Sequence, residues 1–339
     1  MGSINRMYKF KDFRDAYEES KKYRGISKLA DFPPYVTFEV TNLCNFRCVM
    51  CQATYLKGKG QNINFEIFKK AVDEIASYGS LVRFIGYGEP FLYKDIMKAI
   101  EYVKSKGILL HITTNGSMLD EAIAKNVISA GVDVVLFSMQ GLSEAEYCAM
   151  RDVQRPMYKK IIENMERLYG LRKGKRPYIK ITTTITERDK PEDKQAFIEA
   201  HLKHADEVQV TGSTHFVHVD ELFGDKGIWD KMHVARPAEA KGRRCFVGNY
   251  EMLIKADGDV CICCGAFTRD LRIGNVKDDS LFNIWHSQEA GRVRDSIGAG
   301  ELEKFKDCSV CPIRFDYENA GSTVANTQND RTDKYFEVK

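Results

Sequence analysis

The chain has 339 residues and a formal net charge of +3, from 51 Lys and Arg residues against 48 Asp and Glu residues. Such a small excess argues against a nucleic-acid-binding protein or a protein that binds a membrane surface. Hydrophobic residues make up 43% and charged residues 29%, which is typical of a soluble globular protein and not of a disordered one. No run approaches the ~18 apolar residues of a membrane helix, and residues 1–11 lack the apolar stretch of a signal peptide, so we expect a cytoplasmic protein. The ten cysteines of such a chain indicate metal binding or thiol chemistry and not a disulfide framework.

From about Pro34 to Thr211, β-branched apolar segments alternate with segments that place apolar residues three and four positions apart. Six strands alternating with helices favour a parallel sheet with right-handed crossovers. Because the strands number six and not eight, we expect an α/β fold, a partial (β/α)6 TIM-like barrel whose chemistry lies at the carboxyl ends of the strands. The predicted strands are Tyr35–Thr41, Leu81–Tyr87, Ile108–Thr113, Val132–Ser138, Tyr178–Thr184 and Val208–Thr211.

Helices are predicted between these strands, and the rest of the chain has a different character. Residues 1–34 form an N-terminal extension, 35–211 the barrel, 212–244 a linker or substrate loop, 245–311 a small cysteine-rich domain, and 312–339 a polar tail that is either a lid or disordered. The cysteine-rich segment holds six of the ten cysteines, one hairpin and two short helices, so its core is small and would gain from a metal. The predicted barrel helices are Phe65–Tyr78, Lys94–Lys106, Leu119–Ala130, Ser143–Leu171 and Pro191–His204.

Three cysteines directly after the first strand are spaced C-x3-C-x2-C; we call Cys44, Cys48 and Cys51 the first cysteine set. Three thiolates cannot complete a tetrahedral zinc site by themselves. They can hold three irons of a 4Fe-4S cluster and leave the fourth iron open to another ligand. A zinc knuckle that borrows a fourth ligand is the alternative, although the zinc spacings in common use pair C-x2-C motifs.

This motif, placed after the first strand of a partial barrel, resembles the radical S-adenosylmethionine (SAM) superfamily. Three further segments at successive strand ends resemble motifs of that family: its GGEP motif, with Tyr87 in place of the first Gly; its TNG turn; and its S-x-D-G motif, with Gln140 in place of Asp. Each glycine in them could be an ordinary turn glycine, so the order and placement of the motifs carry the resemblance. In chain order the segments are Tyr87-Gly88-Glu89-Pro90, Thr114-Asn115-Gly116 and Ser138-Met139-Gln140-Gly141.

The resemblance implies that the open iron binds the amino and carboxylate groups of SAM, and that reductive cleavage of SAM yields a 5′-deoxyadenosyl radical. It places Met50 on the adenine, Glu89 and backbone groups at the amine, and Arg151 with Ser138 at the carboxylate. The Gln at position 140 leaves the ribose contact open. The implied SAM-binding residues are Met50, Gly88, Glu89, Asn115, Ser138 and Arg151.

A second group of cysteines resembles the SPASM/twitch type of auxiliary cluster domain, and its spacing is similar to that of radical SAM aminocyclitol and sugar dehydrogenases. The resemblance implies one auxiliary 4Fe-4S cluster, in addition to the SAM-binding cluster. Cys261 alternates with Cys263 on a predicted strand, so either thiol can serve as the ligand. A structural zinc site of four cysteines is the alternative. The auxiliary cysteine set is Cys245, Cys263, Cys308 and Cys311.

Two reactions follow from the resemblance. In the first, an alcohol carbon loses a hydrogen atom, a base removes the hydroxyl proton, and the auxiliary cluster accepts the second electron, which gives a ketone. In the second, Cys264 returns a hydrogen atom to the opposite face of the substrate radical, because an S–H bond is weak, and the product is an epimer. A peptide-modifying radical SAM enzyme is a third reading, and a non-catalytic iron–sulfur electron carrier or a zinc-stapled scaffold is a different class.

The segment before Tyr35 is shorter than the leader-binding domain that peptide-modifying relatives usually carry, so we expect a small polar substrate such as a sugar or an aminocyclitol. Candidate substrate contacts are His215, His218 and Glu221, in the loop after the sixth strand; solvated loop residues are the alternative reading. The family also implies an electron donor such as flavodoxin or ferredoxin. Neither a nucleic acid nor a membrane is an expected partner.

Overall fold

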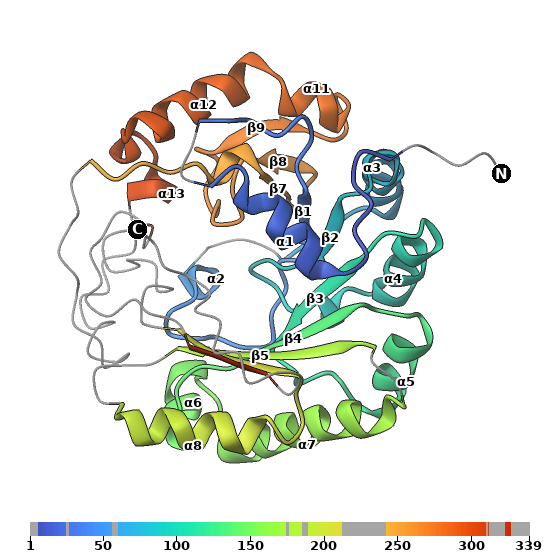
Figure 1. Cartoon of the computed structure of the whole chain (residues 1–339), viewed down its shortest axis with the longest axis vertical. Coiled ribbons are helices and arrows are strands. Elements are labelled where there is room, and N and C mark those ends of the chain that lie inside the picture. The colour runs from blue at the N-terminus through green and yellow to red at the C-terminus, as the bar shows by residue number, and fades with distance from the viewer. Residues whose placement is uncertain are drawn as a thin grey trace.

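The computed structural model describes residues 6–24, 27–55, 60–173, 176–184, 189–211, 242–309, 311 and 323–326. Within these residues ten strands form one sheet, in the order β10-β6-β5-β4-β3-β2-β1-β7-β8-β9 (Figure 1). Strands β1 to β6 are the six predicted ones and run parallel, each beside its neighbour in sequence. This arrangement confirms the partial barrel. Their bounds are β1 Tyr35–Phe38, β2 Leu81–Phe84, β3 Leu110–Thr114, β4 Val134–Ser138, β5 Tyr178–Thr184 and β6 Glu207–Thr211.

Helices cover the outside of these strands (Figure 1). The first of them, α3, shows why the sequence is helical there: Asn64 caps its N-terminus, Gly79 ends it with a φ of 81°, and Phe68 and Ile75 lie on its buried face. The prediction of one helix over Ser143–Leu171 is wrong, because the chain breaks at Asp152, which has a φ of 55°. The helices are α3 Phe65–Tyr78, α4 Ile96–Ser105, α5 Glu121–Ser129, α6 Glu144–Arg151, α7 Arg155–Leu171 and α8 Pro191–His201, with α2 Gln52–Tyr55 in the cysteine loop and the 3-10 turn η1 Pro90–Leu92 after β2.

The cysteine-rich segment continues the barrel sheet. Its first strand, β7, pairs in parallel with β1, so that Val36 lies opposite Met252. The hairpin predicted there is present as β7 and β8. Both parts contribute to one hydrophobic core, in which Trp285 is fully buried and its indole N–H donates to the Ala30 carbonyl at 2.8 Å. The elements are η3 Val247–Asn249, β7 Glu251–Ile254, β8 Asp259–Cys261, β9 Arg272–Asn275, α11 Leu281–Trp285, α12 Gln288–Ala299, η4 Leu302–Lys304 and α13 Lys306–Ser309.

Both ends of the chain contribute elements that the sequence patterns did not predict. Helix α1 (Phe13–Lys21) lies across the starts of β1 and β2, where Ala16 packs against Tyr35 and Leu81. In the polar C-terminal tail, β10 (Thr323–Asn326) pairs antiparallel with β6, so at least these four residues are neither lid nor disordered segment. In the described part of the chain, no helix has the length and apolar character needed to cross a membrane.

Candidate functional site

The first cysteine set follows β1 at the carboxyl end of the barrel. The Cys51 N–H donates to the Cys48 carbonyl at 3.1 Å, and the Thr54 hydroxyl donates to the same carbonyl at 2.8 Å, so the loop is tightly folded. Burial and, to a smaller extent, the neighbouring Cys48 and Cys44 raise the pKa of Cys51 to about 12. Burial also raises the pKa of Cys44, with Cys48 contributing. The three thiols therefore lie within electrostatic reach of one another.

The glycine of the GGEP-like motif is pressed against this cysteine loop. A Cβ at position 88 would lie 2.2 Å from the Thr41 carbonyl oxygen and 2.7 Å from that of Leu43. Real Cβ atoms essentially never show such contacts, and both obstacles are backbone. The next N–H, of Glu89, donates to the same Leu43 carbonyl at 2.8 Å. Gly88 is therefore required by the close approach of two loops, which is a stronger reason than turn geometry.

The carboxylate of Glu89 ties the ends of β2 and β3 together. It is buried and accepts hydrogen bonds from the Thr114 hydroxyl and from the Asn115 N–H, both at 2.7 Å. Burial raises the pKa of Glu89, and these two hydrogen bonds oppose the shift. The side-chain amide of Asn115 donates in turn to Asn45, inside the cysteine loop, at 3.0 Å. Two of the three expected strand-end segments thus meet at the cysteine loop.

Arg151 joins the fourth strand end to the cysteines. Its guanidinium donates to the Ser138 carbonyl and hydroxyl, the latter at 3.0 Å, and to the Cys48 sulfur at 3.4 Å. Its Nε is buried and has no hydrogen-bond partner in the described residues. A buried donor without a partner is costly, so this N–H indicates an acceptor that arrives with a bound group. The carboxylate of SAM is such an acceptor.

Gln140, where the ribose contact was left open, and Met50, the expected adenine contact, have different surroundings. Gln140 accepts a hydrogen bond from the Thr184 hydroxyl at 2.6 Å, which joins the ends of β4 and β5. Met50 is half-buried and packs against the hydrophobic core beside the cysteine loop. The structure therefore brings Gly88, Glu89, Asn115, Ser138 and Arg151 together around the first cysteine set.

The auxiliary cysteine set also forms one neighbourhood. Burial raises the pKa of Cys245 to about 12, and Cys311 adds to the shift. Burial likewise raises the pKa of Cys308, and the neighbouring Cys311 and Cys245 contribute to this shift. Cys263 lies two residues beyond β8 and is within electrostatic reach of Cys245 and Cys311. The structure therefore places Cys263 with the other three thiols.

Cys261 has a different environment from its neighbour Cys263. Its side chain is 1% exposed inside β8, and burial raises its pKa to about 12, with Lys255 and Asp307 as the nearest charges. The alternation of side chains along a strand could not distinguish the two cysteines in the sequence, because residues two positions apart are expected on the same side. The end of β8 at Cys261 separates them, since Cys263 belongs to the loop that follows.

The two cysteine sets supply the thiol donors that 4Fe-4S clusters take. In the described residues no group of three or more His, Cys, Asp or Glu side chains is placed to hold a metal ion. A 4Fe-4S cluster takes one thiolate per iron, so its cysteines surround a body of several atoms and need not converge on one point. Three close thiols with a partnerless Arg N–H, and four thiols elsewhere, meet that requirement.

Tyr87 connects the two cysteine regions, a role that its motif did not predict. Its hydroxyl donates to the Gly265 carbonyl at 3.1 Å, and its ring lies edge-on to Phe267 with 6.4 Å between centroids. A cavity of about 340 Å³ is lined on one side by Cys44 and Tyr87 and on the other by Asp257 and Phe267. This volume is within the range of small-molecule sites. The only sequence signal was the departure of Tyr87 from the family's Gly.

Cys264 has an exposed side chain beside the auxiliary set. Its hydrogen bond with Cys263 raises its pKa well above the usual value, Glu251 adds to the shift, and Arg83 opposes it. Cys264 is therefore within electrostatic reach of Glu251 and Arg83. The predicted substrate residues His215, His218 and Glu221 lie outside the described residues.

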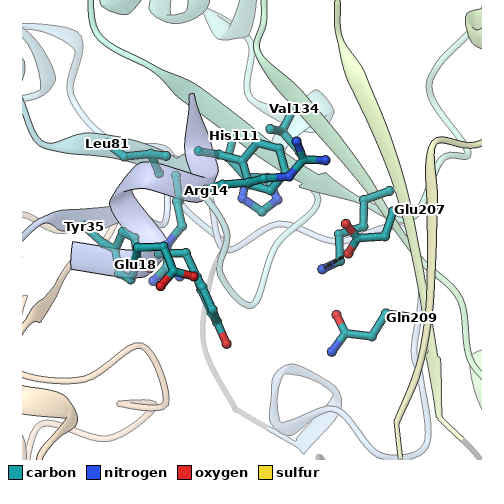
Figure 2. A pocket seen from close by; sticks show the side chains of 12 residues that line it. Arg14, Glu18, Tyr35, Leu81, His111, Val134, Glu207 and Gln209 are labelled. Atoms are coloured by element: carbon teal, nitrogen blue, oxygen red, sulfur yellow. Dashed lines mark ion pairs between the residues drawn. The ribbon is translucent and has the colours of Figure 1, made fainter. Parts of the chain in front are cut away.

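The interior of the barrel is polar, which the sequence analysis did not predict. Arg83 of β2 donates to the Thr37 hydroxyl at 2.7 Å and forms an ion pair with Glu251 of β7. Lys180 of β5 pairs with Glu207 of β6 at 2.6 Å. Figure 2 shows His111 and Glu207 among the side chains that border this space. The available signal was the alternation of polar and apolar residues, as in Glu207, Val208, Gln209 and Val210 of β6.

The fold and the two cysteine sets define an α/β iron–sulfur protein built on a partial barrel. The family model of the Radical SAM superfamily matches residues 38–217, more than half of the chain. A second model, described as an iron-sulfur cluster-binding domain and named SPASM, matches residues 245–312. The chain belongs to the radical SAM superfamily and carries a SPASM domain. Its cofactors are SAM and 4Fe-4S clusters.

One curated relative and two solved structures illustrate the similarity. The tungsten-containing aldehyde ferredoxin oxidoreductase cofactor-modifying protein of Pyrococcus furiosus is 26% identical over 321 residues, which are 83% of this chain and 87% of the relative. BtrN in complex with AdoMet and 2-DOIA matches with a TM-score of 0.53 and 16% identity, over 90% of this chain and 97% of that one. Streptococcus suis SuiB bound to the precursor peptide SuiA matches with a TM-score of 0.61 and 14% identity, over 91% and 79% of the two chains. The two structures share the fold with this chain.

Proposed function

We propose that the protein oxidises an alcohol of a small polar substrate, such as a sugar or an aminocyclitol, to a ketone. The observation that carries the proposal is the 340 Å³ cavity, which the first cysteine loop and the SPASM domain line together. Cys44 of the first cysteine set lines this cavity, and Lys255, Asp257 and Phe267 of the SPASM domain line another part of it. An electron acceptor close to the substrate is what a net oxidation requires.

When bound, SAM would supply the radical chemistry that removes a hydrogen atom from the substrate carbon, and an auxiliary cluster held by Cys245, Cys263, Cys308 and Cys311 would supply the acceptor for the second electron. The chain's own residues hold these groups in place. Arg151, oriented by Ser138, supplies the buried N–H for the SAM carboxylate. Glu89, oriented by Thr114 and Asn115, lies at the ends of β2 and β3, where it would receive the amine of SAM. Tyr87 keeps the auxiliary loop against the SAM site.

The choice of a small polar substrate rests on the barrel interior. Charged and hydrogen-bonding side chains such as Arg83, His111 and Lys180 border a cavity there, and polar groups of this kind fix the orientation of a polar ligand. The Pyrococcus furiosus relative is named as a cofactor-modifying protein of the tungsten-containing aldehyde ferredoxin oxidoreductase. SuiB bound to a precursor peptide represents the peptide-modifying alternative.

An epimerase is the second candidate, and the exposed thiol of Cys264 favours it. In that reaction the thiol returns a hydrogen atom to the substrate carbon, and no net oxidation occurs. Cys264 lies within electrostatic reach of Glu251 and Arg83. The two functions differ in the mass of the product.

The test uses anaerobically reconstituted protein with SAM, a reductant and a panel of sugars and aminocyclitols in D2O. We expect 5′-deoxyadenosine together with a product two mass units lighter than the substrate. A product that gains one deuterium without oxidation, in a manner lost in Cys264→Ala, would establish the epimerase instead. If no 5′-deoxyadenosine forms with any substrate of the panel, and none forms without substrate, the result would favour a non-catalytic iron–sulfur carrier. The peptide SuiA serves as the comparison for the peptide alternative.

A further inference from the structure

Glu39 directly follows β1, at the carboxyl end of the barrel. Its backbone N–H donates to the Ile254 carbonyl at 2.9 Å, so the pairing of β1 with β7 extends to this residue. Side chains alternate between the two faces along a strand. Phe38 belongs to the hydrophobic core, whereas Thr37 accepts a hydrogen bond from Arg83 in the barrel interior. Glu39 continues the series of Thr37, and its side chain therefore lies on the interior side of the sheet.

Glu39 also lines the cavity of about 340 Å³ in which the proposed function places the substrate. Cys44 of the first cysteine set borders this cavity, and so do Lys255 and Asp257 of the SPASM domain. Glu39 is only 2% exposed, so bulk water has little access to it. Its carboxylate thus belongs to the space that the two cysteine-bearing parts of the chain line together.

The surroundings of the carboxylate orient it toward the cavity. Its Oε2 accepts a hydrogen bond from the Tyr87 N–H at 3.2 Å. Burial raises the pKa of Glu39. The Tyr87 N–H and Lys255 oppose this shift, as does the Ala256 N–H, and the charge of Asp257 adds to it. Because Tyr87, Lys255 and Asp257 all line the cavity, the carboxylate faces it as well.

The cavity has two carboxylates, and they differ in their partners. Asp257 is paired with Arg269 at 3.3 Å, whereas Glu39 forms no ion pair with a described residue. Lys255 donates instead to the Phe267 carbonyl at 3.3 Å. A buried carboxylate without a cation is costly to the fold, and it holds a proton more readily than an exposed carboxylate does. Uptake of a proton near neutral pH is the property that a general base requires.

We propose that Glu39 is the general base that removes the hydroxyl proton of the substrate. The inference rests on the proposed function and names the residue for a step that has none. The substrate carbon first loses its hydrogen atom to the SAM-derived radical. The O–H bond then breaks, its proton goes to the Glu39 carboxylate, and its electron pair stays on the oxygen. The resulting radical anion passes one electron to the auxiliary cluster as the C=O bond forms, and the carboxyl group later releases its proton to solvent.

The test uses the full chain, reconstituted anaerobically, with SAM, a reductant and a panel substrate that is deuterated at its C–H positions. Glu39→Gln keeps the size of the side chain, which Gly86 approaches closely, and an oxygen for the Tyr87 N–H. We expect ketone formation to fall at least about a hundredfold, with iron content, SAM affinity and KM unchanged. Deuterium transfer into 5′-deoxyadenosine should continue, because the base acts after the hydrogen atom has left. The control Glu199→Gln, the same change on the exposed face of α8, should leave ketone formation unchanged.

The pH profile separates a base from a residue that only supports the fold. A base acts as the carboxylate, so kcat/KM of the wild type should fall as the pH drops through the raised pKa of Glu39. This acid limb should be absent from the residual activity of Glu39→Gln. Glu39→Asp keeps a carboxylate but withdraws it by one methylene, so it should retain the limb at a lower rate. It takes the place of the amide variant if Glu39→Gln does not fold.

Ketone formation at the wild-type rate in Glu39→Gln, or an acid limb retained there, would overturn the assignment and leave the proposed function standing. Loss of the acid limb in Asp257→Asn alone would do the same, because the base would then be the other carboxylate of the cavity. Loss of deuterium transfer in a folded Glu39→Gln protein with full iron content would place the residue before the proton step and also refute the assignment. If the wild type forms no ketone with any substrate of the panel, the proposed function fails and the assignment fails with it.

Discussion

Gly88→Ala tests whether the approach of two backbones, and not turn geometry, holds the SAM site together. The new methyl carbon would lie 2.2 Å from the Thr41 carbonyl oxygen, more than 1 Å inside the ordinary contact distance of 3.4 Å, and 2.7 Å from that of Leu43. Neither carbonyl can rotate away as a side chain would, so the GGEP-like loop must separate from the cysteine loop. Overpacking of this kind costs about 1–3 kcal/mol and at times more. The separation also breaks the hydrogen bond from the Glu89 N–H to Leu43.

We expect Gly88→Ala to fold but to lose the first cluster, so that iron per chain falls by about half, and to lose SAM binding in equilibrium dialysis. Gly170→Ala in α7 is the matched control, because a Cβ there meets nothing within 4 Å. An alanine in a helix is also more favourable than a glycine, by roughly 0.5–1 kcal/mol. A Gly88→Ala protein with full iron content and normal SAM affinity would refute the reasoning.

Two further predictions concern the auxiliary thiols and the pH dependence of stability. Cys263→Ser should lose about half of the iron, and Cys261→Ser should retain it, because of these two cysteines only Cys263 lies near Cys245 and Cys311. Iron analysis and electron paramagnetic resonance measure the cluster content of each variant. Equal losses of iron in the two variants would contradict the assignment. Lowering the pH from about 7 to about 5.5 should destabilise the wild type by about 1 kcal/mol more than His201→Gln. Burial, with His204 beside it, lowers the pKa of folded His201 from 6.5 to about 3, so the unfolded chain takes up a proton that the folded chain does not. Thermal unfolding at the two pH values measures this difference, and parallel shifts of both proteins would show that His201 is not the cause.

The alternation of apolar segments was sufficient to predict the barrel, because the spacing of apolar residues within each segment indicates whether it forms a strand or a helix. Where one predicted helix proved to be two, a single backbone conformation was responsible. The break between α6 and α7 depends on the left-handed conformation of Asp152, which an apolar period of three and four does not encode. Strand β10 was missed for another reason: four residues in a polar tail gain their structure only by pairing with β6.

The sequence likewise indicated one part of the candidate site more clearly than the other. The spacing of Cys44, Cys48 and Cys51 pointed to the cofactor because the three thiols belong to one short loop, and a short loop brings its cysteines together wherever the chain leads. The auxiliary set was less certain, since Cys261 and Cys263 alternate along the chain and differ only in where β8 ends.

The order of residues along the chain was therefore enough to predict the class of this protein and its cofactors, because the motifs that indicate them are short and local. The tertiary structure alone decided how the two cysteine regions meet. Tyr87 reaches Gly265, 178 positions away, and Arg83 reaches Glu251 because β7 pairs with β1. Contacts of this kind depend on which strands become neighbours in the sheet, and the energy that selects those neighbours comes from a core shared by the whole molecule.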